Sequence, residues 1–450
     1  MDSTILAEFR HRLYETCFTR ARDALFDVAD ALLTDTQAQS FVELSQAQSF
    51  QRAWPSLYEA LEDGRIDRSA LRAHSAAFLP AAMLGSHLVL GLDVSSILRP
   101  DAHTSADRTL VHRSNLPPDA TPVGPGWQFS VLVVLPDPVS ASTYILDSQR
   151  VPSSETATTT GVAQLRALLP LLHAPGVRLL LVQDRGYSNA PWLLATQNLD
   201  VDNLIRARKD QVLYRPAPPR TNRSGRPRLD GKRFKGSDPT THGAPDNEWN
   251  GTDAAGQAVQ VSVWHNLHLR KARHITITVV RVVRAAARNT KRDPQVSWFW
   301  WLGGELPPLD ELPRLYGRRF GQEHGFRFDK QDLLWATPRV RSPEQFERWT
   351  DLVSVVHNQL VLMQPSVAAE RRPWESKERP ASLRQVRRAM GKVLRQVGSP
   401  ARPPQRRGKA PGRAPGATVR RAARHPVIKK GTKTASKAKK TASKQVVQRE

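Results

Sequence analysis

The amino-acid sequence predicts an α/β protein with a mixed-sheet core, a helical N-terminal domain, a β-rich insertion and a disordered basic C-terminal tail. Three observations support this prediction. Apolar residues recur every three or four positions up to about residue 85, β-rich runs alternate with helical stretches after residue 86, and the end of the chain is rich in Lys, Arg, Pro and Gly.

Composition narrows the classes of partner. The chain has 450 residues and a net charge of +25, and residues 401–450 alone contain 16 Lys and Arg against one Glu. Such a balance indicates a polyanionic partner, most commonly nucleic acid. We expect no membrane span, because Pro, Ser, His and Asp interrupt the most apolar window, residues 78–94. A single cysteine, Cys17, excludes an internal disulfide and a cysteine-based zinc site, and suits a reducing cytoplasm.

Residues 1–85 have helical periodicity, with a break at Asp63-Gly64. Asp67 is the expected N-cap of the helix that follows. A small helical domain in this position could bind DNA or could simply pack against a larger domain. The sequence does not separate these two interpretations.

Residues 86–208 are expected to form the first part of the core, in the order β-β-β-α-β-α-β. The expected strands are 87–98, 127–136, 142–151, 177–187 and 201–208, and the expected helices end near residues 173 and 199. The run 177–187 is continuously apolar, which is typical of a strand buried in a mixed sheet.

The remaining chain divides into four further segments. Residues 209–305 predict a basic, looped, β-rich insertion, and residues 306–364 predict helices that begin near Pro313 and at residue 342. A basic helix is expected within 365–398, and residues 399–450 predict a disordered tail.

The motif Tyr316-x2-Arg319-x3-Glu323-x6-Lys330 is the most informative in the chain. On one helix these side chains would lie within a single stripe, at roughly 0°, 300°, 340° and 320°. A carboxylate beside two cations and a phenol suits metal-dependent phosphodiester cleavage, because the carboxylate holds a hard cation and the others grip phosphate oxygens. The alternative is a solvated helix face with weak ion pairs.

Two aspartates could complete a carboxylate cluster with Glu323. Asp93 lies inside an apolar strand, where an acid must be paired, protonated or bound to a metal. Asp184 ends the buried strand at 177–187, where sheets often present ligand-binding residues, although it could instead open a turn with Gly186. If the two strands are neighbours, the aspartates converge at one edge of the sheet.

These residues carry a resemblance to a known family. Asp93, Asp184 in an Asp-x-Gly-Tyr context and the Tyr316/Arg319/Glu323/Lys330 spacing resemble the DDE transposases of bacterial insertion sequences, in the branch with the Tyr-Arg-Glu-Lys signature. The resemblance covers about residues 86–363 and implies an RNase H-like catalytic core. In that branch a β-rich insertion separates the second Asp from the Glu, and here 139 positions separate Asp184 from Glu323.

The resemblance implies cut-and-paste transposition by a homodimer acting on the terminal inverted repeats of a transposon and on target DNA, in the bacterial cytoplasm at the nucleoid. It also implies two roles for the motif residues. Some would be catalytic ligands of two Mg²⁺ ions, which Mn²⁺ could replace, and the others would contact DNA phosphates. The metal ligands would be Asp93, Asp184 and Glu323, and the phosphate contacts Tyr316, Arg319 and Lys330. One departure is that Val94-Ser95 follows the first Asp, where many relatives have a second acid.

Weaker signals and two alternative functions stay open. Arg226, in Gly225-Arg226-Pro227, is a candidate minor-groove contact or an ordinary basic loop residue. We assign no insertion tryptophan to base stacking, and interpret His265 and His268 as structural because no third metal ligand is at hand. The alternatives to a transposase are a catalytically inactive, transposase-derived DNA-binding protein and an RNase H-like nuclease that acts on other nucleic acids.

Overall fold

A computed structural model describes residues 4–430 except 114–116, 118–119, 175, 220–225, 254–255, 289, 291–293, 368–370, 377, 406–411, 413 and 419–420. The N-terminal region is helical, as predicted. Its helices are α1 (Thr4–Arg12), which continues into a short π-helix η1 (Leu13–Cys17), α2 (Arg22–Thr34), α3 (Phe41–Leu44), α4 (Pro55–Asp63) and α5 (Arg68–Ala77). The Asp67 carboxylate caps α5 by accepting from the backbone N–H groups of Ser69 and Ala70. Sequence patterning missed a small two-stranded sheet, β1 (Phe18–Arg20) with β2 (Arg65–Ile66).

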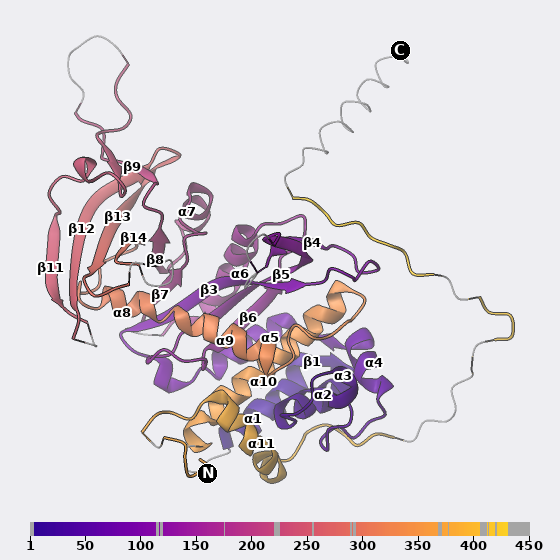
Figure 1. Cartoon of the computed structure of the whole chain (residues 1–450). Coiled ribbons are helices and arrows are strands. Elements are labelled where there is room, and N and C mark those ends of the chain that lie inside the picture. Colours follow the sequence, from indigo (N-terminus) through magenta and orange to yellow (C-terminus); the bar gives the residue numbers. More distant parts are fainter. Residues whose placement is uncertain are drawn as a thin grey trace, which may run out of the picture.

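The core is a mixed sheet with the topology of an RNase H-like fold. Its elements are β3 (His87–Leu98), β5 (Val123–Val134), β6 (Tyr144–Arg150), α6 (Ala157–Leu172), β7 (Arg178–Gln183), α7 (Ala190–Thr196) and β8 (Asp202–Ala207). Strands β3, β5 and β6 form an antiparallel meander, and β7 and β8 continue the sheet parallel to β3. The spatial order is therefore β6-β5-β3-β7-β8 (Figure 1). The structure adds one strand that the sequence did not predict, β4 (Thr109–His112), paired with β5.

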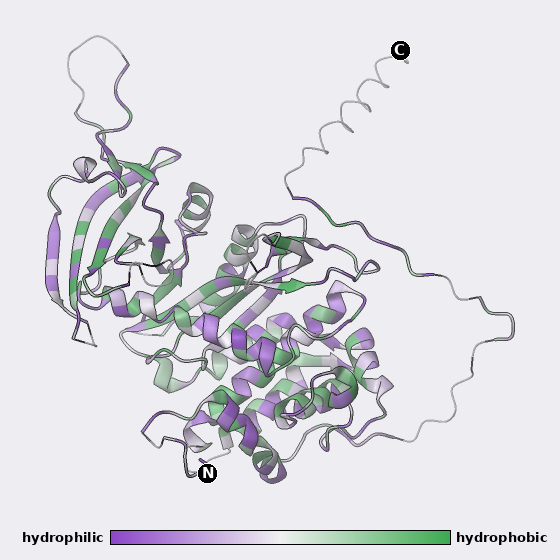
Figure 2. Ribbon diagram, in the orientation of Figure 1, coloured by the Kyte–Doolittle hydropathy of each residue, from purple (hydrophilic) through white to green (hydrophobic). Residues whose placement is uncertain are grey.

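The insertion extends this sheet instead of forming a separate one. Its strands are β9 (Val212–Tyr214), β10 (Arg233–Lys235), β11 (Asn247–Thr252), β12 (Ala258–Leu269), β13 (Ala272–Arg284) and β14 (Val296–Leu302), and a single 3-10 turn, η3 (Pro239–Thr241), follows β10. Strand β14 pairs with β8 in antiparallel register, so core and insertion share one 12-stranded sheet. Hydrophobic and hydrophilic residues alternate along parts of β12 and β13 (Figure 2).

The C-terminal helices return to the core. They are α8 (Leu312–Gly317), α9 (Phe320–Gln331), α10 (Pro343–Val367) and α11 (Leu383–Val397), and α8 and α9 lie along the sheet (Figure 1). The long α10 is buried on most faces, as expected, and packs against α2, α11 and β6. The Tyr-Arg-Glu-Lys motif does not lie on one uninterrupted helix as predicted, because α8 ends at Gly317 and α9 begins at Phe320, although Arg318 and Arg319 between them keep right-handed helical dihedral angles.

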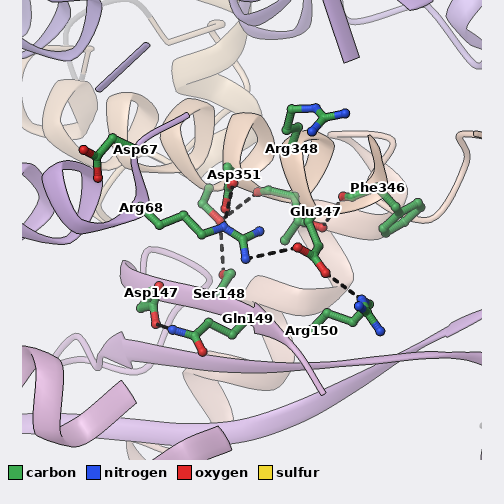
Figure 3. Close-up of polar contacts among 12 residues, drawn as sticks. Asp67, Arg68, Asp147, Ser148, Gln149, Arg150, Phe346, Glu347, Arg348 and Asp351 are labelled. Carbon is green, nitrogen blue, oxygen red and sulfur yellow. Dashed lines mark hydrogen bonds and ion pairs between the residues drawn. The ribbon is translucent and has the colours of Figure 1, made fainter. Parts of the chain in front are cut away.

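Ion pairs join the N-terminal helices to the core and to α10 (Figure 3). The Arg68 guanidinium lies 3.3 Å from a Glu347 carboxylate oxygen and 3.1 Å from an Asp351 oxygen. Arg150, at the end of β6, donates to the other oxygen of Glu347 at 2.6 Å and also pairs with Asp107. These contacts connect α5, β6 and α10, and each of these three carboxylates has an arginine beside it.

A short part of the C-terminal tail, residues 421–430, contacts the core while most of its side chains stay exposed. The His425 N–H donates to the His103 carbonyl at 2.8 Å, and Ile428 forms a parallel bridge with Thr109 on β4. The buried Arg108 guanidinium donates to the His425 carbonyl at 3.0 Å. The prediction for residues 431–450 falls outside the described residues.

Candidate active site

The two aspartates of the proposed cluster lie side by side on neighbouring strands. Strands β3 and β7 are parallel, with Leu92 opposite Gln183, so Asp93 and Asp184 are the next residues along each. The prediction that these strands are neighbours is confirmed. Each carboxylate is also oriented locally, because Asp93 accepts from the Val94 N–H and Asp184 from the Gly186 N–H, both at 2.7 Å.

Helix α9 brings Glu323 to the same place. Arg319, at the start of α9, contacts Asp93, and Lys330, near its end, donates to the Ser96 carbonyl at 3.0 Å. Helix α9 therefore runs along β3 in the same direction as the strand.

Two glycines let α9 lie close to the loop between β5 and β6. A Cβ at Gly321 would sit 2.9 Å from the Ser140 carbonyl oxygen, and one at Gly325 would sit 2.8 Å from the Thr143 hydroxyl oxygen. Larger side chains at these positions would push the helix, and with it Glu323, away from the core.

Arg319 is the cation at the centre of the carboxylates. Its guanidinium is 3.3 Å from an Asp93 oxygen and 2.5 Å from a Glu323 oxygen. Its side chain is only 8% exposed, whereas that of Glu323 is 49% exposed. A buried arginine therefore links the strand carboxylate to the helix carboxylate, which remains open to solvent.

The charges in this cluster are unbalanced. Burial raises the pKa of Asp93 to about 6, Arg319 opposes this shift, and the charges of Asp184 and Glu323 add to it. Burial would lower the pKa of Arg319, but Tyr316, Asp93 and Glu323 together raise it. Asp93 and Glu323 thus share one arginine while Asp184 adds a further negative charge, and the buried Asp93 is costly to ionise without a further cation.

Sequence reasoning missed two buried polar residues behind the carboxylates. The Tyr187 side chain is 4% exposed, and its pKa is well above the ordinary value because of burial and the nearby charges of Asp93 and Asp184. Gln183, directly before Asp184, is fully buried. The Tyr187 hydroxyl and both polar atoms of Gln183 have no hydrogen-bond partner among the described residues. The signal for Tyr187 was present in the Asp-Arg-Gly-Tyr run, 184–187.

The other motif residues are placed unequally. Tyr316 is buried on α8, with its ring centre 4.5 Å from that of Phe299. Burial raises its pKa, and the Arg319 guanidinium carbon lies 5.9 Å from its ring centre. Burial lowers the pKa of Lys330, whose ammonium group lies 5.7 Å from the Trp335 ring centre. Tyr316 is thus on α8, Arg319 directly precedes α9, and Glu323 and Lys330 are on α9, with Glu323 the most exposed of the four.

The insertion residues lie apart from this cluster. Arg226 is exposed in the connection between β9 and β10, and its neighbour Gly225 is outside the described residues. Trp264 and Trp298 are buried against each other and against Phe234, as core residues. The two histidines make structural contacts: His268 pairs with Asp230 at 3.1 Å, and His265 contacts Asn247 and Thr278.

The donor chemistry fits a hard divalent cation. Asp93, Asp184 and Glu323 offer only oxygen atoms, and their uncompensated negative charge favours a cation between them. As the side chains lie, no three His, Cys, Asp or Glu residues in the described part of the chain are close enough together to hold an ion. The Glu323 carboxylate is paired with Arg319, and its half-exposed side chain has room to move.

Comparison with known proteins identifies the family. A model of the DDE superfamily endonucleases matches residues 13–268, which is more than half of the chain. The chain belongs to this superfamily. The resemblance inferred from the motifs is confirmed, and the match includes Asp93 and Asp184 but stops before Glu323. As a DDE endonuclease, the protein belongs to enzymes that generally use divalent metals.

A solved structure is similar to the chain at low sequence identity. A cryo-EM structure of a piggyBac transposase synaptic complex with hairpin DNA is similar at a TM-score of 0.41 and 10% identity, covering 84% of this chain and 73% of that one. Curated proteins give no match. Among the described helices, none is both long enough and apolar enough to cross a bilayer.

Proposed function

We propose that this DDE endonuclease is a transposase that cuts DNA at transposon ends and joins the freed ends to target DNA. The observation that supports the proposal is that Arg319 pairs with both Asp93 and Glu323, while Asp184 directly follows β7, the strand beside Asp93. The family model alone supports the endonuclease, whereas the Tyr-Arg-Glu-Lys spacing supports the more specific activity.

In this proposal Asp93, Asp184 and Glu323 hold two Mg²⁺ ions, which Mn²⁺ can replace. When bound, the ions would activate the attacking water or 3′-hydroxyl and stabilise the leaving oxygen. Asp93 and Asp184 are fixed by strand pairing, while Glu323 adjusts from an exposed helix position. The Arg319 guanidinium, released from Glu323, would form charge-assisted bonds to a phosphate near the scissile bond.

Tyr316 and Lys330 would support the phosphate from either side of Arg319. Tyr316 is deeply buried, so its contribution is to position the Arg319 guanidinium as much as to contact DNA. The proposed substrates are two kinds of double-stranded DNA, the terminal inverted repeats of a transposon and the target DNA. A homodimer would bring two ends together, and we place the reaction at the bacterial nucleoid.

The test is excision of a marked element from a donor plasmid in cells. Glu323→Ala should abolish excision, while the purified variant keeps its affinity for DNA and its melting temperature, because the side chain is half-exposed. Glu59→Ala, an exposed substitution on α4, serves as the matched control and should excise normally. Excision by Glu323→Ala at the wild-type rate would contradict the proposal.

The alternative functions are outcomes of the same assay. DNA binding without cleavage in either Mg²⁺ or Mn²⁺ would indicate an inactive, transposase-derived binding protein. Faster cleavage of an RNA–DNA hybrid than of duplex DNA would instead indicate an RNase H-like nuclease.

A further inference from the structure

A groove of about 980 Å³ lies at the end of β3 beyond the carboxylates, between the N-terminal helices and the core. Three segments line it: residues 39–42 at the start of α3, residues 98–105 after β3, and residues 336–341 after α9. Strand β3, which carries Asp93, and helix α9, which carries Glu323, both lead toward this groove. Their ends meet there, because Lys330 near the end of α9 contacts Ser96 near the end of β3.

Two arginines project into solvent at this groove. Along residues 338–341, buried and exposed residues alternate, so Pro338 and Val340 face inward while Arg339 and Arg341 face outward. The buried Arg99 guanidinium fixes this segment by donating to the carbonyls of Pro338 and Val340. Within the described residues, the guanidinium groups of Arg339 and Arg341 have no ion-pair or hydrogen-bond partner.

The rest of the lining offers neutral hydrogen-bonding groups. Gln39, Thr104 and Thr337 are exposed, and the Tyr58 side chain is 37% exposed. Arginine together with Ser, Thr, Gln and Tyr is the set that contacts phosphate and sugar in protein–DNA complexes. One acid, Asp101, is also part of the lining, against three arginines.

The docked part of the tail adds a second source of positive charge at the groove. His425 donates to the carbonyl of His103, and His103 lies between the lining residues Ala102 and Thr104. This contact holds the neighbouring Arg424, which is exposed, near the rim of the groove.

We propose that this groove binds the backbone of duplex DNA on one side of the cleavage point. The proposal rests on the proposed function for its substrate. Leu98 is five residues beyond Asp93 on the same strand, which corresponds to about 17 Å at ~3.3 Å per residue. At ~3.4 Å per base pair, the groove would contact DNA about five base pairs from the scissile phosphate.

The first experiment measures binding without catalysis. Fluorescence anisotropy of a random 40-base-pair duplex is followed against salt concentration in EDTA, with the full-length protein. Arg339→Ala and Arg341→Ala should each reduce the slope of log K against log[salt] by about 0.9, and together weaken binding by roughly tenfold or more at 150 mM salt. Arg166→Ala, an exposed arginine on α6, is the control and should leave both values unchanged.

The second experiment identifies what occupies the groove. Because Cys17 is buried, Thr337→Cys provides an accessible thiol for a photo-crosslinker. Crosslinking to duplex DNA supports the proposal. Crosslinking to a second protein copy, or an unchanged affinity and salt slope in the double variant, would overturn it. Neither assay needs cleavage. If the protein cannot cut DNA but the arginine variants still lose DNA binding, the proposal for the groove stands and only the proposed activity is rejected.

Discussion

The protein contains two clusters of buried and half-buried acids that differ in how their charge is balanced. Between α5, β6 and α10, Glu347 and Asp351 lie beside Arg68 and Arg150 (Figure 3), and Asp107 also pairs with Arg150. At the candidate active site, Asp93 and Glu323 share Arg319, and Asp184 has no ion-pair partner among the described residues. The first arrangement holds segments of the chain together. The second leaves negative charge for a ligand to neutralise, which is expected where function competes with stability.

The largest expected effect comes from removing a strand carboxylate. Asp93→Asn should lower DNA cleavage by on the order of 10³-fold or more, because a proposed metal ligand is lost. The same variant should be more stable than the wild type at pH 8, because burial makes the Asp93 charge costly. Strand-cleavage rates and thermal unfolding would be measured side by side. A large loss of stability in Asp93→Asn would instead indicate that Asp93 has a structural role, as Glu347 and Asp351 have.

Removing Arg68 from the cluster that it forms with Glu347 and Asp351 should have the opposite effect, a loss of stability rather than of DNA cleavage. Arg68→Ala leaves Glu347 and Asp351 facing each other without their shared partner, and we expect a loss of about 3–5 kcal/mol in unfolding free energy. Urea unfolding would measure this change. Arg72→Ala is a milder control, since its ion pair with Asp147 is long, at 3.9 Å. Equal effects of the two substitutions would contradict the importance of the Arg68 contacts.

The pH dependence of stability tests the same cluster. Burial raises the pKa of Asp351 to about 7, despite Arg68, so the folded protein holds a proton there that the unfolded chain has released. Stability from this group is therefore lost as pH rises from about 4 to 7. Asp351→Asn should gain stability relative to the wild type over that range, by ~4 kcal/mol. A difference that stays constant between pH 5 and pH 8 would exclude this pKa.

The smallest expected effect is stabilisation by metal. Addition of 10 mM Mg²⁺ should raise the unfolding free energy by ~1 kcal/mol if the dissociation constant is about 1 mM. Calorimetry in EDTA and in Mg²⁺ would detect the shift. Asp184→Asn should remove it, whereas a change in the structural cluster, Asp351→Asn, should retain it.

Local patterns were sufficient to predict most core elements. The apolar runs predicted β3, β5, β6, β7 and β8, whereas the adjacency of β3 and β7 was only a condition for the two aspartates to converge, and the structure meets it. Strand β4 was missed because its four residues are too few to show a clear alternation. The break between α8 and α9 was missed because Arg318 and Arg319 stay in the right-handed helical region, so the helical spacing of the motif continues across it.

Contacts between distant segments could not be predicted in this way. Arg68 and Asp351 are 283 positions apart, and nothing near either residue indicates the other. Similarly, the docked tail depends on β4, whose existence the sequence did not indicate, although Val427 and Ile428 form a short apolar pair in an otherwise polar segment. The pairing of Arg319 with both Asp93 and Glu323 also required the fold, because the motif alone placed Arg319 only beside Glu323.

The ladder between β8 and β14 has a mechanical consequence. Five consecutive residue pairs, from Asn203 with Leu302 to Ala207 with Trp298, join the insertion to the strand beside β7, which leads into Asp184. A force applied to the insertion is therefore carried by the hydrogen-bonded backbone of the sheet, not by a flexible connection. Insertion and core are parts of one continuous sheet, so a displacement of the insertion would be passed on to the strands that present the aspartates.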